Sequence, residues 1–299
     1  MELKVITWNI QGAAALSWNR PYEIKKNIVD KIFEQKADIA VLTEFVISKG
    51  WDYFQEQLEK KGYIWFMTNT TGKNGILIFI NKDLVYEKNL VQSLYQENAI
   101  SSNTDGCNIL RITLPMSQNK TLTIMGVRME TGISKASLKA QYDAEREALD
   151  NILLPKIELQ KPNNMYIVCG DFNNARCLGN LTENFNADDY KGKAQIGYNL
   201  NIIKDTFDNL GFAMADIGEP KHGITHGIPT WDGYIPNDHI FVRGFKVMKC
   251  ESEKVKKCES ETDKDLPDHD IIWAELECET IKQTRQQNDL LRFGCSRLL

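Results

Sequence analysis

An apolar run at residues 165–169 leads directly into the polar tetrapeptide Gly170-Asp171-Phe172-Asn173. Such a run, ended by a glycine, predicts a buried β-strand. If the backbone stays extended beyond the run, Asp171 and Asn173 project to the same side, because side chains alternate along a strand with a period of two. A carboxylate can accept hydrogen bonds or bind a cation, and an amide can donate to an anion. This strand end therefore suits a water held against a phosphate better than it suits a core.

The same pattern recurs along the chain. Polar side chains follow two further predicted strands and precede two others: Asn9, Glu44, Asp238, Asp268 and His269. In sheets with antiparallel neighbours, strand ends and strand starts can share one edge. Each position taken alone is compatible with an ordinary polar strand end. Taken together, the set predicts a polar site at one edge of a sheet.

The composition is that of a globular domain. The chain has 299 residues, of which 42% are hydrophobic and 26% are charged. We recognise no secretion signal and no apolar stretch long enough to span a membrane. Seven cysteines without framework spacing favour reduced thiols and a cytoplasmic location. We expect one domain over residues 1–278, followed by a C-terminal extension over residues 279–299 in which a short packed helix is favoured over a functional tail.

The charge balance bears on possible partners. The chain carries 36 basic and 41 acidic side chains, a formal net charge of −5. Tight nonspecific binding to nucleic acid depends on Lys and Arg contacts to phosphates, so this balance argues against it. It leaves room for a local basic groove.

Helical and strand patterns alternate along the sequence. We predict helices at residues 21–35, 51–61, 135–152 and 203–210, and further strands at residues 63–67, 75–80, 108–114, 121–127, 238–242, 245–250 and 270–277. The polar segments 92–106 and 174–201 are interpreted as insertions, the second as a loop beside the site. The pattern predicts an α+β fold of two mixed sheets packed face to face, with outer helices.

An ordered series of short motifs carries a resemblance to a known family. The motifs are Thr7-Trp8-Asn9, Leu42-Thr43-Glu44, Gly170-Asp171-Phe172-Asn173, Thr230-Trp231, Asn237-Asp238-His239-Ile240 and Asp268-His269-Asp270. In this order, from residue 3 to about residue 277, the chain resembles the endonuclease/exonuclease/phosphatase superfamily. The resemblance implies a four-layer α/β/β/α sandwich with the active site at one edge of the two sheets.

The resemblance also implies a metal site. Glu44 would be the main metal ligand, Asn9 would be a ligand or support beside it, and Asp268 would lie next to the metal. A cluster of carboxylates needs a cation to offset its mutual repulsion. Ligation by oxygen alone favours Mg²⁺ or Mn²⁺ over zinc.

The remaining motif residues would carry out the chemistry. By the same resemblance, Asp171 would orient and deprotonate the attacking water, and Asn173 would hold a phosphate oxygen. His269 would bond the scissile phosphate or move a proton, while Asp238 would fix the tautomer of its ring. A histidine, whose ordinary pKa is about 6.5, becomes a useful acid when a carboxylate stabilises its charged form.

One position departs from the superfamily pattern. Many members place a His or Tyr on the strand before the long helix, where it touches the phosphate. Here Arg128 takes that place. A guanidinium can bind phosphate through two hydrogen bonds, so a substrate-binding role is chemically reasonable. Alternatively, Arg128 pairs with Glu130 or Glu145.

These observations predict a Mg²⁺- or Mn²⁺-dependent phosphoesterase, most simply a nuclease that cleaves nucleic acid by direct attack of water. Lys73, Lys135 and Arg176 are further candidate phosphate contacts. One alternative is a phosphatase or phosphodiesterase for inositol phosphates, lipid headgroups or another small phosphoester. A second alternative, of another class, is a catalytically inactive relative that only binds. The sequence indicates no protein partner.

Overall fold

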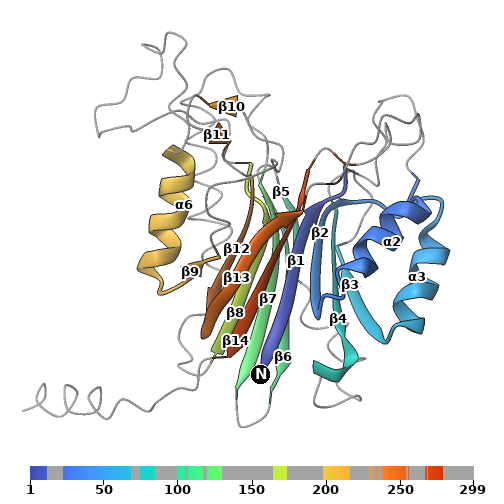
Figure 1. The fold of residues 1–299 in the computed structure, drawn as a ribbon, viewed down its shortest axis with the longest axis horizontal. Coiled ribbons are helices and arrows are strands. Elements are labelled where there is room, and N and C mark those ends of the chain that lie inside the picture. The colour runs from blue at the N-terminus through green and yellow to red at the C-terminus, as the bar shows by residue number, and fades with distance from the viewer. Residues whose placement is uncertain are drawn as a thin grey trace, which may run out of the picture.

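Two six-stranded β-sheets packed face to face form the centre of the molecule (Figure 1). The computed structural model describes residues 1–11, 23–68, 75–84, 100–104, 107–116, 120–129, 164–173, 198–215, 229–230, 233–234, 237–253, 255, 267 and 269–278. Both sheets are mixed, because each contains one parallel pair among antiparallel neighbours. The predicted α+β sandwich of two mixed sheets is therefore confirmed.

The first sheet has the strand order β13-β14-β1-β2-β4-β3. Its strands are β1 (Glu2–Asn9), β2 (Ile39–Phe45), β3 (Tyr63–Met67), β4 (Gly75–Asn81), β13 (Phe245–Glu253) and β14 (Ile271–Cys278). Strand β1 runs parallel to β2 and antiparallel to β14. The end of β1, the end of β2 and the start of β14 consequently lie at the same edge.

The second sheet has the strand order β5-β6-β7-β8-β12-β9. Its strands are β5 (Ile100–Thr104), β6 (Cys107–Pro115), β7 (Thr121–Met129), β8 (Asn164–Asp171), β9 (Ala213–Met214) and β12 (Asp238–Arg243). Strand β8 is parallel to β7 and antiparallel to β12, so the ends of β7 and β8 lie beside the start of β12. A separate short ladder joins β10 (Pro229–Thr230) to β11 (Gly233–Tyr234), and a 3₁₀ turn, η1 (Lys82–Leu84), follows β4.

The main core fills the space between the sheets. Alternate residues of the central strands, such as Val5, Val41 and Ile124, share this apolar cluster. Gly126 lies where the sheets approach closely, because a Cβ at this position would lie 2.6 Å from Cγ2 of Ile76 on the facing sheet. The period-two pattern that predicted the strands thus places one face of each sheet against the other.

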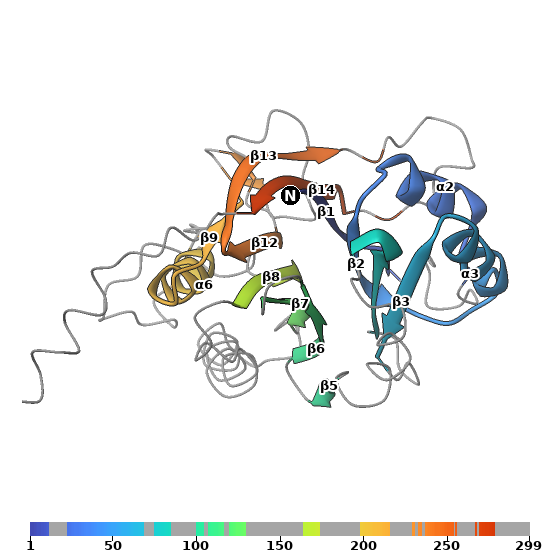
Figure 2. The ribbon, with the colours of Figure 1, turned by 90° about the horizontal axis from the view of Figure 1, so that it is seen from below.

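Helices cover the outer faces, as Figure 2 shows. Helices α2 (Lys26–Glu34) and α3 (Trp51–Lys60) bury apolar residues in a second cluster on the outer side of the first sheet. Helix α6 (Tyr198–Asn209) packs against the outer side of the second sheet through Ile203 and Phe207. Among the helices that the structure describes, none has the length and apolar character needed to cross a membrane.

The first predicted helix begins later than expected. The pattern at residues 21–35 predicted a helix over the whole segment, but α2 starts at Lys26. The backbone N–H of Ile24 donates to the carbonyl of Lys49 at 2.7 Å, in an isolated bridge between Glu23 and Lys49. A backbone committed to that bridge cannot also make helical bonds, so tertiary pairing overrides the helical spacing. The predicted helix at residues 51–61 is confirmed as α3 within one residue.

Two predicted insertions are partly wrong. Residues 100–104 of the segment 92–106 form β5, which pairs with β6. Residues 198–201, assigned to the loop 174–201, form the first turn of α6. The helix predicted at residues 135–152 and the extension 279–299 lie outside the described residues, so the proposed domain boundary stays a prediction.

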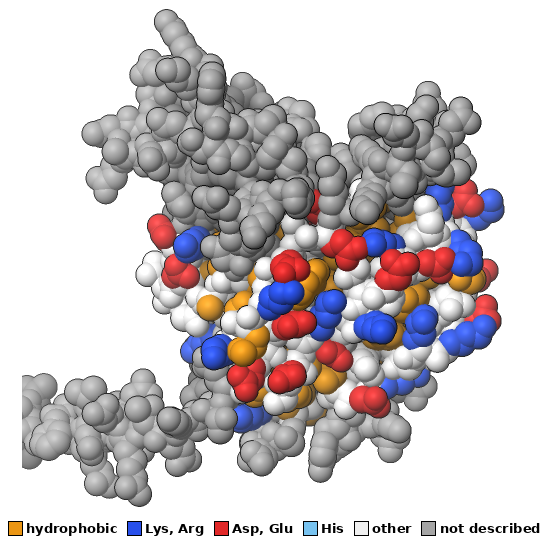
Figure 3. All heavy atoms as spheres, viewed as in Figure 1, with side chains coloured by type: hydrophobic (Ala, Val, Ile, Leu, Met, Phe, Trp, Pro, Cys, Tyr) orange, Lys and Arg blue, Asp and Glu red, His pale blue; other side chains and the backbone are white. Residues whose placement is uncertain are grey.

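Charges of both signs are interspersed over the described residues on the face drawn in Figure 3. Exposed ion pairs also form within single helices, such as Lys26 with Asp30 in α2 and Lys60 with Glu56 in α3. Exposed pairs of this kind contribute little to stability.

Candidate active site

The polar strand ends meet at one edge of the sandwich. In the antiparallel pair of β8 and β12, Asp171 lies directly opposite Asp238. The Nδ2 of Asn9, on the first sheet, donates to Oδ2 of Asp171, on the second, at 2.8 Å. The indole N–H of Trp8 donates to the carbonyl of His269 at 2.9 Å. The expectation that strand ends and starts share one edge is confirmed for these residues, while Asp268 lies outside the described residues.

Asp171 is buried and held by three hydrogen bonds. Besides the bond from Asn9, Oδ1 accepts from the backbone N–H of Asn173 at 2.9 Å, and Oδ2 accepts from its Nδ2 at 3.1 Å. The same Nδ2 donates to the carbonyl of Met129 at 2.5 Å. Both amide hydrogens of Asn173 are therefore engaged inside the protein.

Asp171 and Asn173 meet by a different route from the one predicted. The backbone does not stay extended, because Asn173 adopts a left-handed conformation with φ of 49°. Asparagine tolerates this region better than most residues, since its short side chain can bond to nearby backbone. A tight turn, rather than strand alternation, brings the amide back onto the carboxylate.

Gly170 allows the end of β8 to lie very close to β7. Its φ is +145°, and a Cβ built there would lie 1.9 Å from the carbonyl oxygen of Val127 on β7. No side chain fits so close to a backbone atom. The glycine of the tetrapeptide is thus required by the close approach of β7 and β8.

Glu44 reaches the site because β2 is irregular. Ala40 and Leu42 point into the outer cluster beneath the helices, so regular alternation would place Glu44 there as well. Instead, the register with β4 shifts between Thr43 and Phe45, and Glu44 has a φ of 53°. A bulge of this kind redirects a side chain, and a positive φ at a residue other than glycine is strained. The sequence carries no signal for this feature.

The carboxylate of Glu44 pairs with Arg128 of the opposite sheet. Nε and Nη2 of Arg128 both donate to Oε1 of Glu44, at 3.1 and 2.9 Å. Arg128 faces the space between the sheets, because its neighbours Val127 and Met129 belong to the outer cluster. The sequence analysis considered Glu130 and Glu145 as partners of Arg128, but not Glu44. Glu130 and Glu145 lie outside the described residues. Strand alternation from Ile124 through Gly126 could have predicted that Arg128 lies on the inner face. It could not have identified Glu44 as the partner of Arg128.

His269 forms a buried pair with Asp238. Nδ1 of the ring lies 2.6 Å from Oδ2 of Asp238, and both side chains are at most 5% exposed. A carboxylate at Nδ1 favours the tautomer that carries its proton there. That tautomer leaves Nε2 as the nitrogen that can exchange a proton.

The environment of Asp171 changes its acidity. Burial, followed by repulsion from Asp238, raises the pKa of Asp171 to about 7, although His269 and Arg128 act in the opposite direction. A carboxyl group with a pKa near neutrality can accept and release a proton at physiological pH. This is the property expected of a general base.

The oxygen donors at the edge fit a hard divalent cation. Asn9 and Glu44 end adjacent parallel strands, in which Asn9 is paired with Thr43. Oδ1 of Asn9 accepts one hydrogen bond, from the N–H of Gln11 at 3.0 Å. Both hydrogen bonds from Arg128 end on Oε1 of Glu44, so the Arg128–Glu44 pair does not use Oε2. Carboxylate and amide oxygens are ligands typical of Mg²⁺. Within the described residues, no group of three His, Cys, Asp or Glu side chains converges, so a third protein ligand would have to come from elsewhere.

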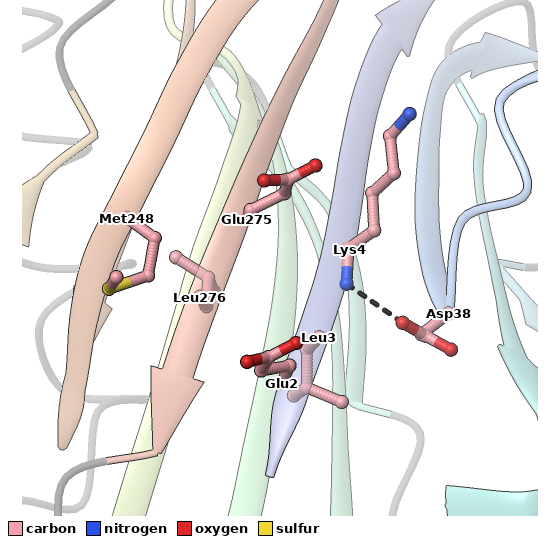
Figure 4. Close-up of a pocket in the computed structure, with 7 residues that line it drawn as sticks. All are labelled: Glu2, Leu3, Lys4, Asp38, Met248, Glu275 and Leu276. Carbon is pink, nitrogen blue, oxygen red and sulfur yellow. Dashed lines mark hydrogen bonds between the residues drawn. The ribbon is translucent and has the colours of Figure 1, made fainter.

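A cavity of about 350 Å³ lies at the opposite end of the first sheet. Its lining residues are Glu2, Leu3, Lys4, Asp38, Met248, Glu275 and Leu276 (Figure 4). The backbone N–H of Lys4 donates to Asp38 there at 2.8 Å. None of the proposed site residues borders this cavity.

Comparisons with solved structures identify the fold. A D. rerio TDP2 humanized by 14 mutations is 16% identical with a TM-score of 0.56, over 92% of this chain and 99% of that chain. The human nocturnin catalytic domain is 15% identical with a TM-score of 0.55, over 93% and 94%. ANGEL2, described as a 2′,3′-cyclic phosphatase, is 15% identical with a TM-score of 0.56, over 94% and 96%. These likenesses show a common two-sheet sandwich.

The comparison of sequences identifies the family. No match is found among curated proteins. The model of the Endonuclease/Exonuclease/phosphatase family matches residues 6–259, which is most of the chain. Members of this family are phosphoester hydrolases and generally use divalent metal ions. The chain therefore belongs to the Endonuclease/Exonuclease/phosphatase family.

Proposed function

We propose that this phosphoesterase is a Mg²⁺- or Mn²⁺-dependent nuclease that hydrolyses nucleic-acid phosphodiesters by direct attack of water. The observation that carries the proposal is the juxtaposition of Asp171 and the Asp238–His269 pair. Asp171 has a pKa raised to about 7 and lies opposite Asp238 across β8 and β12. A proton acceptor and an oriented imidazole at one strand junction suit an in-line displacement at phosphorus.

The proposed chemistry gives separate roles to Asp171 and to the Asp238–His269 pair. Asp171 orients the attacking water and accepts its proton, because its oxygens are fixed by Asn9 and Asn173. His269, held by Asp238 through Nδ1, bonds the scissile phosphate or transfers a proton through Nε2. Positioned proton transfer of this kind typically accelerates a reaction by about 10²- to 10⁴-fold.

Glu44 and Asn9, with Asp268, are the residues proposed to hold the divalent ion. When bound, such an ion stabilises negative charge on the phosphate oxygens. Arg128 is the proposed protein contact to the same phosphate, as a guanidinium offers paired donors to phosphate oxygens. Asn173 orients Asp171 in the structure; its proposed contact to a phosphate oxygen requires release of the bond to Met129 or to Asp171.

Nucleic acid is the proposed substrate class. A D. rerio TDP2 structure with the same fold is complexed with a single-strand DNA product. The other candidate phosphate contacts, Lys73, Lys135 and Arg176, lie outside the described residues, so they remain predictions.

A small phosphoester is the second candidate. The formal net charge of −5 and the interspersed charges in Figure 3 favour it, because a long polyanion binds best to a continuous basic surface. ANGEL2, with the same fold, is described as a 2′,3′-cyclic phosphatase. A catalytically inactive binding relative is disfavoured, because the chain retains the full set of candidate residues: Asn9, Glu44, Asp171, Asn173, Asp238, Asp268 and His269.

One substrate panel separates these proposals. We suggest assaying plasmid DNA, an abasic duplex, single-stranded RNA, an inositol polyphosphate and sphingomyelin with Mg²⁺ and with Mn²⁺. The nuclease proposal predicts preferred turnover of a nucleic acid. Preferred turnover of inositol polyphosphate or sphingomyelin would contradict it and leave the phosphoesterase chemistry intact, whereas turnover of none of them would favour an inactive relative.

A further inference from the structure

Arg128 bonds to Glu44 in the structure, and this contact competes with its proposed role as a phosphate contact. As a phosphate contact, its guanidinium must face the substrate. In the structure, Nε and Nη2 instead both bond to Oε1 of Glu44, the proposed metal ligand. The side chains of Arg128 and Glu44 are only 10% and 23% exposed, so solvent screens this pair weakly.

A divalent ion at Glu44 changes the balance of this pair. The ion would add two positive charges next to a carboxylate whose charge Arg128 already neutralises. In a partly buried site, two positive charges beside one carboxylate repel strongly enough to alter binding equilibria by about tenfold or more. The ion and the guanidinium therefore compete for the same carboxylate, even if they bond to different oxygens.

We propose that Arg128 is the internal counter-ion of Glu44, which a divalent ion displaces, so that metal binding releases the guanidinium for the substrate phosphate. This inference rests on the proposed function, since it assumes that Glu44 binds the metal. It makes Arg128 a coupling residue between two binding events. By thermodynamic linkage, the metal must strengthen phosphate binding and the phosphate must strengthen metal binding by the same factor.

The geometry around Arg128 supports a coupling role. Arg128 pairs in register with Asp171 on β8, while its hydrogen bonds cross to Glu44 on β2. Arg128 therefore bonds to Glu44 and also acts electrostatically on Asp171, whose pKa it lowers against the effect of burial. The bulge that redirects Glu44 towards the inner face creates this contact.

The test uses Arg128→Gln and measures binding without turnover. Mn²⁺ affinity is measured by calorimetry in protein freed of metal with EDTA and then dialysed, and orthophosphate affinity is measured with saturating Mg²⁺. The counter-ion account predicts that Arg128→Gln binds Mn²⁺ about tenfold or more tightly and binds orthophosphate about tenfold or more weakly. Opposite effects on the two ligands are not produced by a general loss of structure.

Two further variants serve as controls. Arg243→Gln removes the same charge from the far end of β12, where Arg243 pairs in register with Tyr166, and should leave both affinities within about twofold. Arg128→Lys keeps the positive charge but loses the paired hydrogen bonds, so it should bind Mn²⁺ less tightly than Arg128→Gln does. Unchanged or weaker Mn²⁺ binding in Arg128→Gln, or Mn²⁺ binding by Arg128→Lys as tight as that of Arg128→Gln, would overturn the proposal. None of these binding measurements involves hydrolysis, so they test the role of Arg128 even if the nuclease proposal fails.

Discussion

Asp171 and Asp238 lie opposite each other in the antiparallel ladder of β8 and β12, yet their surroundings give them different properties. Asp238 is bonded to Nδ1 of His269 at 2.6 Å. Among the described residues, the donors to Asp171 are neutral amide groups of Asn9 and Asn173. The difference in partners leaves Asp171, whose pKa is raised to about 7, as the group that can accept a proton, while Asp238 holds the imidazole.

The raised pKa of Asp171 predicts a pH-dependent stability. The folded protein holds a proton on Asp171 up to about pH 7, whereas in the unfolded chain the same group loses it near its ordinary value of 3.8. Between these values the folded state binds more protons, so the free energy of unfolding falls as pH rises. In EDTA, we expect denaturant unfolding to show a loss of a few kcal/mol between pH 5 and pH 8.

The variant Asp171→Asn isolates this effect. It cannot ionise, so its free energy of unfolding should vary less with pH over the same range than that of the wild type. An Asp30→Asn variant on the surface of α2 serves as the control and should follow the wild type. Parallel pH profiles for Asp171→Asn and the wild type would show that Asp171 does not carry the shifted pKa.

Removal of either proton-transfer group should abolish most of the activity. Asp171→Ala or His269→Ala is expected to lower kcat by about 10²- to 10⁴-fold, the usual effect of losing a positioned acid or base. Turnover of the preferred substrate of the panel, with circular dichroism to verify the fold, provides the measurement. A wild-type rate in a folded variant would exclude that residue from the mechanism.

Asp238→Asn should impair catalysis through the ring that it orients. An amide at this position no longer stabilises the charged imidazole or favours the proton on Nδ1. We expect a decrease in kcat comparable with that of His269→Ala, together with a changed pH–rate profile. If kcat falls but the pH–rate profile keeps its wild-type shape, Asp238 has a structural role only.

Gly170→Ala should destabilise the protein strongly. The new Cβ would lie 1.9 Å from the carbonyl of Val127, a backbone atom that cannot move without disturbing β7. We expect a loss of about 3 kcal/mol or more in thermal or denaturant unfolding. The matched control is Gly62→Ala, which also has a positive φ (78°) but no atom within 4 Å, and should cost about 1 kcal/mol. Equal costs for the two variants would show that the contact with Val127 is relieved cheaply.

The parts of the fold that follow from alternation were predictable from the sequence. The ends of β1 and β8, and the starts of β12 and β14, were identified within one or two residues because apolar runs stop at polar side chains. Their meeting at one edge followed from antiparallel pairing. The helix at 51–60 was equally clear, because its apolar spacing agrees with its tertiary contacts.

Other features of the site depend on tertiary structure. The positive φ of Glu44 has no sequence signal, and that of Asn173 has only the weak one that asparagine tolerates the left-handed region. The pairing of Arg128 with Glu44 depends on how one sheet is stacked on the other, which local patterns do not specify. These features decide where the functional side chains point, so the residues of the site were easier to predict than their contacts.

Metal dependence of phosphodiester hydrolysis tests the central claim most directly. Turnover of the preferred nucleic-acid substrate should be measured with Mg²⁺, with Mn²⁺, and in EDTA with protein verified to contain no metal, while circular dichroism monitors the fold. The account predicts turnover with either ion, a folded but inactive protein in EDTA, and recovery when Mg²⁺ is restored. Full turnover by the verified metal-free protein would contradict the proposed roles of Glu44 and Asn9 and, with them, the mechanism.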